Sequence, residues 1–274
     1  MRGMTGQETR YDSIAEGYAT YWSPVHRPAT LRLLDEVADI AGAGQCRIVD
    51  VGCGTGAMAV AAAARWPSAQ LEATDLSAGM LALAARTVAE AGPAGERVRL
   101  TKAPADRLPF PDRSFDVALS AFVLQLVPSR PRALREMRRV LRRGGRLAYV
   151  SWLAGELPFA ADAAWEAALD AAGVEREPGG GHDELASPEA AANQLRAAGL
   201  SDVTARADRL VHQFTPEAYA AFVTRFDDGD LMLGLEPRVR EAVTADLLER
   251  LGRLTPADLR LDLPIVYASG VRRS

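Results

Sequence analysis

Short apolar segments alternate with helical segments between residues 46 and 152, and this alternation restricts the possible folds more than any other feature. The expected strands are 46–51, 70–75, 97–103, 115–123 and 146–152. One connecting helix follows the glycine-rich turn at 52–56, and the next is capped by Ser77. Strands that alternate with helices across short turns predict parallel pairing, with helices on both faces of the sheet.

The flanking segments are expected to extend this architecture. Further helices are expected over 9–22 (ending before Pro24), 28–41, 130–145 and 187–198, the last capped by Ser187. The helix over 130–145 is expected to end at Gly144 and Gly145. Two more strands are expected near 202–214 and 263–272. The predicted fold class is therefore α/β, with a doubly wound, seven-stranded, mostly parallel sheet in a single domain over 1–274.

Charge and composition argue against several classes of function. The chain has 32 basic and 36 acidic residues and a formal net charge of −4, so no nucleic-acid surface is expected. The longest wholly apolar run, 57–64, is shorter than the roughly 20 residues that a bilayer requires, so no membrane insertion is expected. Cys46 and Cys53 would lie too far apart on one strand for a disulfide. Because the three histidines are also scattered, we expect a cytoplasmic protein without a metal site.

The glycine-rich turn lies where a doubly wound sheet binds its ligand, at the carboxyl ends of the strands. Gly52, Gly54 and Gly56 lack a Cβ and let a small molecule approach the main chain closely. Asp75 ends the next expected strand, about 20 residues after Gly52, which is the offset at which a carboxylate accepts hydrogen bonds from a ribose. Together the two features predict a cofactor that contains a nucleoside.

Two classes of cofactor fit this prediction, the nicotinamide dinucleotides and S-adenosylmethionine. The dinucleotide fingerprint is G-x-G-x-x-G, whereas this turn is G-x-G-x-G. Asp50, two residues upstream of the first glycine, would attract an ammonium group and repel a pyrophosphate. The spacing and the charge therefore favour S-adenosylmethionine and disfavour the alternative of a nicotinamide dehydrogenase.

Four segments of the chain resemble the class I S-adenosylmethionine-dependent methyltransferases. They read VDVGCGTG, ATDLSAGML, APADRLPFPDRSFDVALSAFVLQLVP and ALREMRRVLRRGGRLAYVSW, in this order. The resemblance covers about residues 10–152 and is closest to the ubiquinone/menaquinone-pathway enzymes and many natural-product methyltransferases. It implies a Rossmann-like methyltransferase fold with helical lid insertions and S-adenosylmethionine as the cofactor.

The same resemblance implies a set of cofactor-binding residues. They are Tyr11, Tyr18, Asp50, Gly52, Gly54, Gly56, Asp75, Leu76, Met80, Ala105 and Asp106. Asp50 would meet the ammonium group, Asp75 the ribose and Asp106 the adenine amino edge. Residues 1–27 would form N-terminal lid helices, although their two tyrosines would equally suit a packing stripe.

The segments 153–186 and 215–260 are expected to be helical insertions that form the acceptor pocket. With their flanks they supply Trp152, Phe159, Trp165, Phe214, Tyr219, Phe222, Phe226 and Met232. So many large apolar side chains favour a bulky acceptor. We therefore expect O- or C-methylation of a small, bulky, apolar molecule in secondary metabolism. The Asn/Asp-Pro-Pro-Tyr segment of nucleobase-methylating enzymes is absent after the fourth strand.

The residues leave the catalytic group open. His182 lies in a glycine-rich loop of the kind that closes over a site, and Gln125 could orient an acceptor without deprotonating it. His26 and His212 are further candidates. Two other functions also stay open: cyclisation of a polyketide-like substrate without methyl transfer, and non-catalytic cofactor binding as the partner of another enzyme. The protein is expected to be a monomer or a homodimer.

Overall fold

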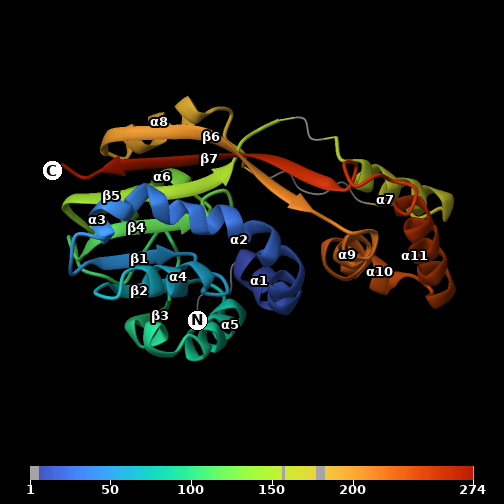
Figure 1. Ribbon diagram of the computed structural model, residues 1–274, viewed down its shortest axis with the longest axis horizontal. Coiled ribbons are helices and arrows are strands. Elements are labelled where there is room, and N and C mark those ends of the chain that lie inside the picture. The colour runs from blue at the N-terminus through green and yellow to red at the C-terminus, as the bar shows by residue number, and fades with distance from the viewer. Residues whose placement is uncertain (1–5, 156–157, 177–182, 274) are drawn as a thin grey trace.

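A seven-stranded sheet runs through the protein, and a computed structural model describes residues 6–155, 158–176 and 183–273. The strands are β1 (Arg47–Val51), β2 (Gln70–Asp75), β3 (Val98–Lys102), β4 (Phe115–Ala121), β5 (Leu141–Trp152), β6 (Ser201–Gln213) and β7 (Arg260–Val271). They lie side by side in the order β3-β2-β1-β4-β5-β7-β6 (Figure 1). Strands β1 to β5 are parallel to one another, and β7 is antiparallel to β5 and β6. The predicted doubly wound, mostly parallel sheet is confirmed.

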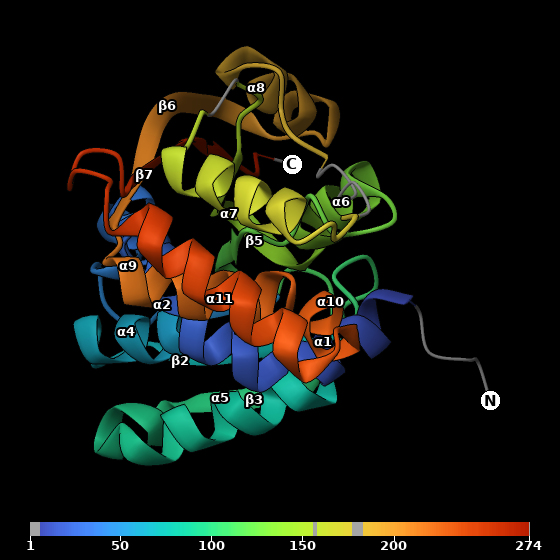
Figure 2. The ribbon, with the colours of Figure 1, turned by 90° about the vertical axis from the view of Figure 1, so that its right-hand side faces the viewer.

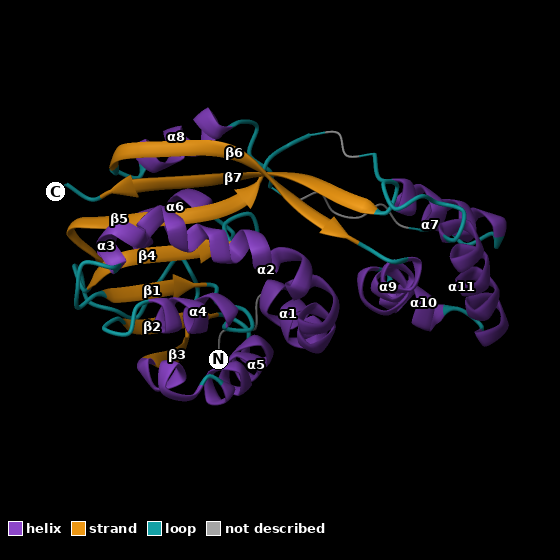
Figure 3. Cartoon of the chain, in the orientation of Figure 1, coloured by secondary structure: helices purple, strands orange, loops and turns teal. Residues whose placement is uncertain are grey.

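Helices precede, connect and cover these strands (Figure 3). The N-terminal helices are α1 (Gly6–Gly17), the π-helix η1 (Tyr18–Trp22), α2 (Ser23–Arg32), the 3-10 helix η2 (Leu33–Val37) and α3 (Ala38–Ala41). Those between the strands are α4 (Ala57–Arg65), α5 (Ala78–Glu90), η3 (Gly92–Arg97), α6 (Arg130–Val140), α7 (Ala160–Ala171) and α8 (Pro188–Ala197). Between β6 and β7 come α9 (Pro216–Phe222), η4 (Val223–Asp227), α10 (Gly229–Gly234) and α11 (Pro237–Leu251). No helix of the described residues combines the length and apolarity that a membrane span requires.

The strands are apolar on both faces because each face of the sheet carries its own core. Ile48 of β1 packs in one core with Met58 of α4, whereas its neighbours Val49 and Val51 pack in the other. Leu134 and Met137 of α6 belong to that second core. Nearly continuous apolar runs are therefore what this buried parallel sheet requires.

The N-terminal helices differ from the prediction. The expected helix end before Pro24 is wrong, because α1, η1 and α2 follow one another without a break to Arg32. Pro24 is the second residue of α2 and directly follows the π-helix, whose residue Tyr18 accepts from the N–H of Ser23. The expected helix over 28–41 is divided between the end of α2, η2 and α3.

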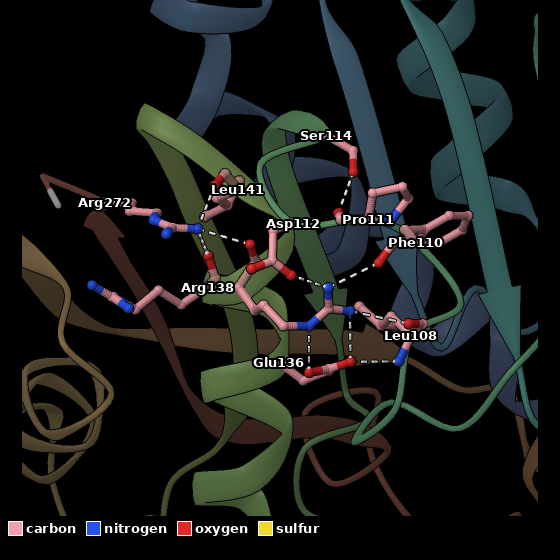
Figure 4. Close-up of polar contacts among 10 residues, drawn as sticks. Leu108, Phe110, Pro111, Asp112, Ser114, Glu136, Arg138, Leu141 and Arg272 are labelled. Atoms are coloured by element: carbon pink, nitrogen blue, oxygen red, sulfur yellow. Dashed lines mark hydrogen bonds and ion pairs between the residues drawn. The ribbon is translucent and has the colours of Figure 1, made fainter.

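The end of α6 also differs from the prediction. The helix ends at Val140, not at the glycines 144 and 145, because Leu141 already pairs with Phe115 of β4 as the start of β5. The guanidinium of Arg272 donates to the main-chain oxygens of Arg138, Arg139 and Leu141 (Figure 4). A side chain from the far end of the chain thus takes the place of the expected glycine cap.

Arg139 ties the loop over 107–114 to α6. Its guanidinium donates to both carboxylate oxygens of Glu136, to Asp112 at 2.6 Å, and to the main-chain oxygens of Leu108 and Phe110 (Figure 4). The hydrogen bond from Arg139 also lowers the pKa of Glu136.

We expect Arg139→Met to lower the free energy of unfolding by about 2–4 kcal/mol, since several charge-assisted hydrogen bonds are lost together. Urea denaturation would measure the change. Arg135→Met, at an exposed position of the same helix, is the matched control. Equal stability of the two variants would show that this network does not hold the loop.

The helices α7, α9, η4, α10 and α11 form a group that we call the distal helical lobe. Strands β6 and β7 extend past the rest of the sheet and reach this lobe, which is at the right of Figure 1 and faces the viewer in Figure 2. Its interior is aromatic: Tyr219 of α9 packs edge-to-face against Phe159 and Phe214. The lobe contacts the N-terminal helices through stacked ring pairs, Tyr21 on Phe226 and Trp22 on Phe222.

Candidate active site

The turn between β1 and α4 is built around three glycines with positive φ angles. They are 76° at Gly52, 52° at Gly54 and 81° at Gly56, a region that favours glycine. A Cβ on Gly52 would lie 2.3 Å from a methyl carbon of Val123, so a side chain there is excluded by space as well. The N–H groups of Gly52 and Cys53 both donate to the carbonyl of Thr74 in β2, at 2.7 and 2.8 Å. These bonds fix the turn at the carboxyl ends of β1 and β2.

A cavity of about 960 Å³ lies against this turn. The predicted cofactor-binding residues that line it are Tyr11, Tyr18, Gly52, Gly54, Asp75, Leu76, Met80, Ala105 and Asp106. Gly56 does not line it: a Cβ there would lie 3.1 Å from the Cβ of Ala84. Its predicted cofactor contact stays a prediction, and the third glycine lets α4 and α5 approach each other closely.

Asp75 is the junction between the turn and α5. One carboxylate oxygen accepts from the N–H of Gly54 and the other from the N–H of Ser77, both at 2.9 Å. Burial, the largest influence, raises its pKa above the ordinary value. Each carboxylate oxygen has a second lone pair, so both can still accept from a pair of ribose hydroxyls.

Asp50 is a buried carboxylate, and neither of its oxygens has a hydrogen-bond partner among the described residues. Its side chain is 1% exposed, and burial followed by the charge of Asp75 raises its pKa to about 8. It lines a second, smaller cavity of about 50 Å³ that borders the large one at Gly52 and Gly54. Buried charges normally have partners, so this geometry fits the ammonium group of an amino acid.

The N-terminal helices form one wall of the cavity. The rings of Tyr11 and Tyr18 meet edge-to-face at 6.3 Å, and both pack against Met80 and Leu83 of α5. Both tyrosines also line the cavity. The packing stripe is therefore observed, and the lid role of the same residues stays a prediction. Burial raises the pKa of both phenols.

Asp106, which also lines the cavity, forms an ion pair with Arg132 at 3.5 Å.

The other half of the cavity is aromatic. The ring of His26 stacks on Phe122 with centroids 4.6 Å apart and contacts Trp22 and Trp152 at 4.6 and 5.3 Å. The hydroxyl of Tyr18 lies 3.3 Å from Nδ1 of the same histidine. Phe122 has a φ of 56°, which is uncommon for a bulky residue and fits a functional position.

Of the two predicted catalytic residues, only Gln125 can be placed. It lines the cavity, and its Oε1 accepts from the hydroxyl of Ser151 at 3.1 Å. Its Nε2 can therefore donate into the cavity. His182 lies outside the described residues. His212, the other histidine candidate besides His26, packs against Phe214 on β6 and does not line the cavity.

The helical insertions supply few of the residues that line this cavity, and their expected role in an acceptor pocket stays a prediction. Of the large apolar residues named for that pocket, only Trp152 lines the cavity. The segment 153–186 contributes Leu153 and Glu184 among its described residues, and 215–260 contributes none. The other large apolar residues are buried in or packed against the core on one face of the sheet. Several of their rings contact one another in the distal helical lobe, as Phe222 does with Phe214 and Phe226.

Phe122 and Trp22 line the cavity but were missed in the sequence. Phe122 did have a signal, because it follows β4 at the sheet edge where ligands bind in this class of fold. Trp22 had no such signal, because it reaches the cavity only through the unbroken N-terminal helices. Within the described residues, no group of three histidine, cysteine or carboxylate side chains is arranged to hold a metal ion.

Residues 48–145 match the family model of a methyltransferase domain. The 27-O-demethylrifamycin SV methyltransferase of Amycolatopsis mediterranei is 31% identical over 224 residues, covering 79% of this chain and 75% of that protein. The ubiquinone/menaquinone biosynthesis C-methyltransferase of Syntrophotalea carbinolica is 38% identical over 148 residues, covering 52% of this chain and 60% of the relative. The chain thus matches less than two thirds of the length of the quinone-pathway relatives.

Solved structures share the fold. The [4+2]-cyclase SpnF superimposes with a TM-score of 0.63 at 24% identity, covering 98% of this chain and 96% of that one. The phosphoethanolamine N-methyltransferase 2 of Haemonchus contortus, solved with S-adenosyl-L-methionine, gives a TM-score of 0.58 at 17% identity, covering 100% and 61%. The match to the rifamycin relative and the match to the methyltransferase family model agree, and the chain belongs to the S-adenosylmethionine-dependent methyltransferase family.

Proposed function

We propose that the protein transfers a methyl group from S-adenosylmethionine to an oxygen or carbon of a small, bulky and largely apolar acceptor in secondary metabolism. One observation carries the proposal: a single cavity joins a polar half at Gly52, Gly54 and Asp75 to an aromatic half at Phe122 and Trp152. The two halves suit a nucleoside cofactor and an apolar acceptor bound side by side.

The polar half would hold the cofactor through this chain's own groups. Asp75 accepts from the ribose, Asp50 meets the ammonium, and Leu76 and Met80 flank the adenine, whose amino edge faces Ala105 and Asp106. S-adenosylmethionine supplies a methyl group on a positively charged sulfur, which a nucleophile attacks in line. Rigid placement of both partners therefore accounts for much of the rate.

The aromatic half would orient the acceptor. Phe122 and Trp152 offer flat apolar walls, and the Nε2 of Gln125 donates to an acceptor oxygen while Ser151 holds the amide in place. The relatives named above comprise a C-methyltransferase and an enzyme whose name specifies an O-demethyl rifamycin. Their names support a bulky acceptor and leave the methylated atom open.

The alternative is a reaction that uses the bound cofactor without methyl transfer, such as cyclisation of a polyketide-like substrate. It stays open because His26, the histidine candidate that lines the cavity, packs among Trp22, Phe122 and Trp152 and has no assigned acceptor to deprotonate. We propose further that the protein acts in the cytoplasm as a monomer or homodimer; its two free, buried cysteines support this location.

Incubation of the purified protein with methyl-labelled S-adenosylmethionine and an extract of the producing cells tests the proposal. We expect label in an organic-soluble product, and Asp75→Ala as the matched control should give far less. Cofactor binding with no labelled product would favour the cyclisation alternative. Preferential binding of a nicotinamide dinucleotide would overturn both.

A further inference from the structure

His26 of α2 lies at the junction of the two cavities. It lines both of them, as do Gly52 and Gly54 of the glycine turn. Its ring also contacts Phe122 and Trp152, the walls of the aromatic half. In the proposed function the methyl group passes from the polar half to the aromatic half, so His26 borders the path of transfer.

Three aromatic rings hold the imidazole of His26 in one orientation. It is stacked on Phe122 at an interplanar angle of 22°, whereas Trp22 and Trp152 meet it at 62° and 58°. The residue is 5% exposed, so little bulk water reaches its ring nitrogens. A group that takes a proton in a transition state has to be placed in this way, because its reach is only about 3 Å.

Tyr18 determines which ring nitrogen of His26 can act. Its hydroxyl lies 3.3 Å from Nδ1, and the two ring centroids are 6.1 Å apart. Burial raises the pKa of this phenol, so the hydroxyl stays neutral and its oxygen can accept from an Nδ1–H group. A neutral imidazole with its proton on Nδ1 accepts a proton at Nε2. Gln125, which also lines the cavity, cannot do so because an amide is not a base.

We infer that His26 is a catalytic residue whose Nε2 takes the proton of an acceptor hydroxyl as the methyl group is transferred to that oxygen. The inference rests on the proposed function and deepens it, since it assigns the base and places the methyl group on oxygen. The acceptor oxygen forms a bond to the methyl carbon while the carbon–sulfur bond breaks, and the electron pair of the broken bond stays on sulfur. The proton of the hydroxyl moves to Nε2, and the imidazolium later releases it to water. Tyr18 is a positioning residue, because it acts through Nδ1.

The rate of product labelling from methyl-labelled S-adenosylmethionine and cell extract tests this assignment. We expect His26→Gln to lower the rate by about 100-fold or more, the usual contribution of a general base, and to leave the Kd of S-adenosylhomocysteine unchanged. His212→Gln is the matched control, because His212 is on β6 and lines neither cavity. NMR of the product should show the new methyl group on oxygen.

Two further variants separate catalysis from packing. His26→Ala empties the place of the ring, and added imidazole should raise its rate by about 10-fold or more. Pyrazole should not, because it has the same shape and is a far weaker base. Tyr18→Phe keeps its ring and loses one hydrogen bond, so it should lower kcat about 10-fold with little change in the KM of the cofactor.

The assignment is overturned if His26→Gln methylates at the rate of the unchanged protein, or if it loses S-adenosylhomocysteine binding together with the rate. Equal rescue by imidazole and pyrazole, or a new methyl group on carbon, would also overturn it. If His26→Ala does not bind S-adenosylhomocysteine, the rate of His26→Gln decides alone. Absence of labelled product from the unchanged protein would instead refute the proposed function.

Discussion

Asp50→Asn is expected to stabilise the ligand-free protein and, at the same time, to weaken its binding of S-adenosylhomocysteine. The carboxyl group of Asp50 is buried without a partner among the described residues, and its pKa is raised to about 8 from an ordinary value near 3.8. In the unfolded chain the same group ionises freely. Folding above pH 4 therefore requires either uptake of a proton or burial of an unpaired charge.

The pH dependence of this effect has a definite sign. Between about pH 4 and pH 8 the folded state binds one more proton at Asp50 than the unfolded state does, so Asp50 makes the protein less stable as the pH rises through this window. Asparagine removes that contribution. At pH 7.5 we expect the free energy of unfolding of Asp50→Asn to exceed that of the unchanged protein by about 2–4 kcal/mol, a gain that shrinks toward pH 4.

Cofactor binding should respond in the opposite direction. An ammonium group beside Asp50 stabilises the ionised carboxylate, so binding releases a proton below pH 8, and affinity should rise between pH 6 and pH 8. Asp50→Asn should lose both the affinity and this pH dependence. Thermal denaturation at several pH values and calorimetry would measure these effects, with the exposed Asp35→Asn as control. A destabilised Asp50→Asn would show that the carboxylate has a partner within the protein.

Asp75→Ala is expected to weaken S-adenosylhomocysteine binding by about 1.5–3 kcal/mol, the range for hydrogen bonds to a charged group, which is roughly a 10- to 150-fold increase in Kd. In the proposed function the carboxylate accepts from the ribose, and in the structure it accepts from the N–H groups of Gly54 and Ser77. Its loss is therefore expected to loosen the glycine turn as well.

Glu72→Ala provides the control for this prediction, since Glu72 is on the same strand but lines neither cavity. Calorimetry should give a Kd close to that of the unchanged protein for Glu72→Ala and a much larger one for Asp75→Ala. An unchanged affinity of Asp75→Ala would remove this residue from the ribose role.

The parts of the fold that depend on local signals could be predicted from the sequence. The strand over 70–75 has the predicted bounds, and Ser77 and Ser187 cap their helices by accepting from Met80 and Ala190. The path of the N-terminal helices could not be predicted in this way. A π-helix before Pro24 keeps them continuous, and it is fixed by long-range contacts such as Trp22 on Phe222.

The polar half of the cavity was more predictable than the aromatic half for the same physical reason. Gly52 directly follows β1 and Asp75 ends β2, so the order of the strands places them together. The aromatic half combines Trp22, Phe122 and Trp152, which come from three distant elements, and no pattern in one segment reveals that they meet. The aromatic residues of the distal helical lobe carried a strong sequence signal, but they pack in the core on one face of the sheet.

Calorimetric titration of the full chain with S-adenosylhomocysteine, and separately with NADH, tests the central claim most directly. We expect saturable binding of one S-adenosylhomocysteine per chain, abolished or greatly weakened by Asp75→Ala, and no saturable binding of NADH. Saturable binding of NADH without binding of S-adenosylhomocysteine would contradict it.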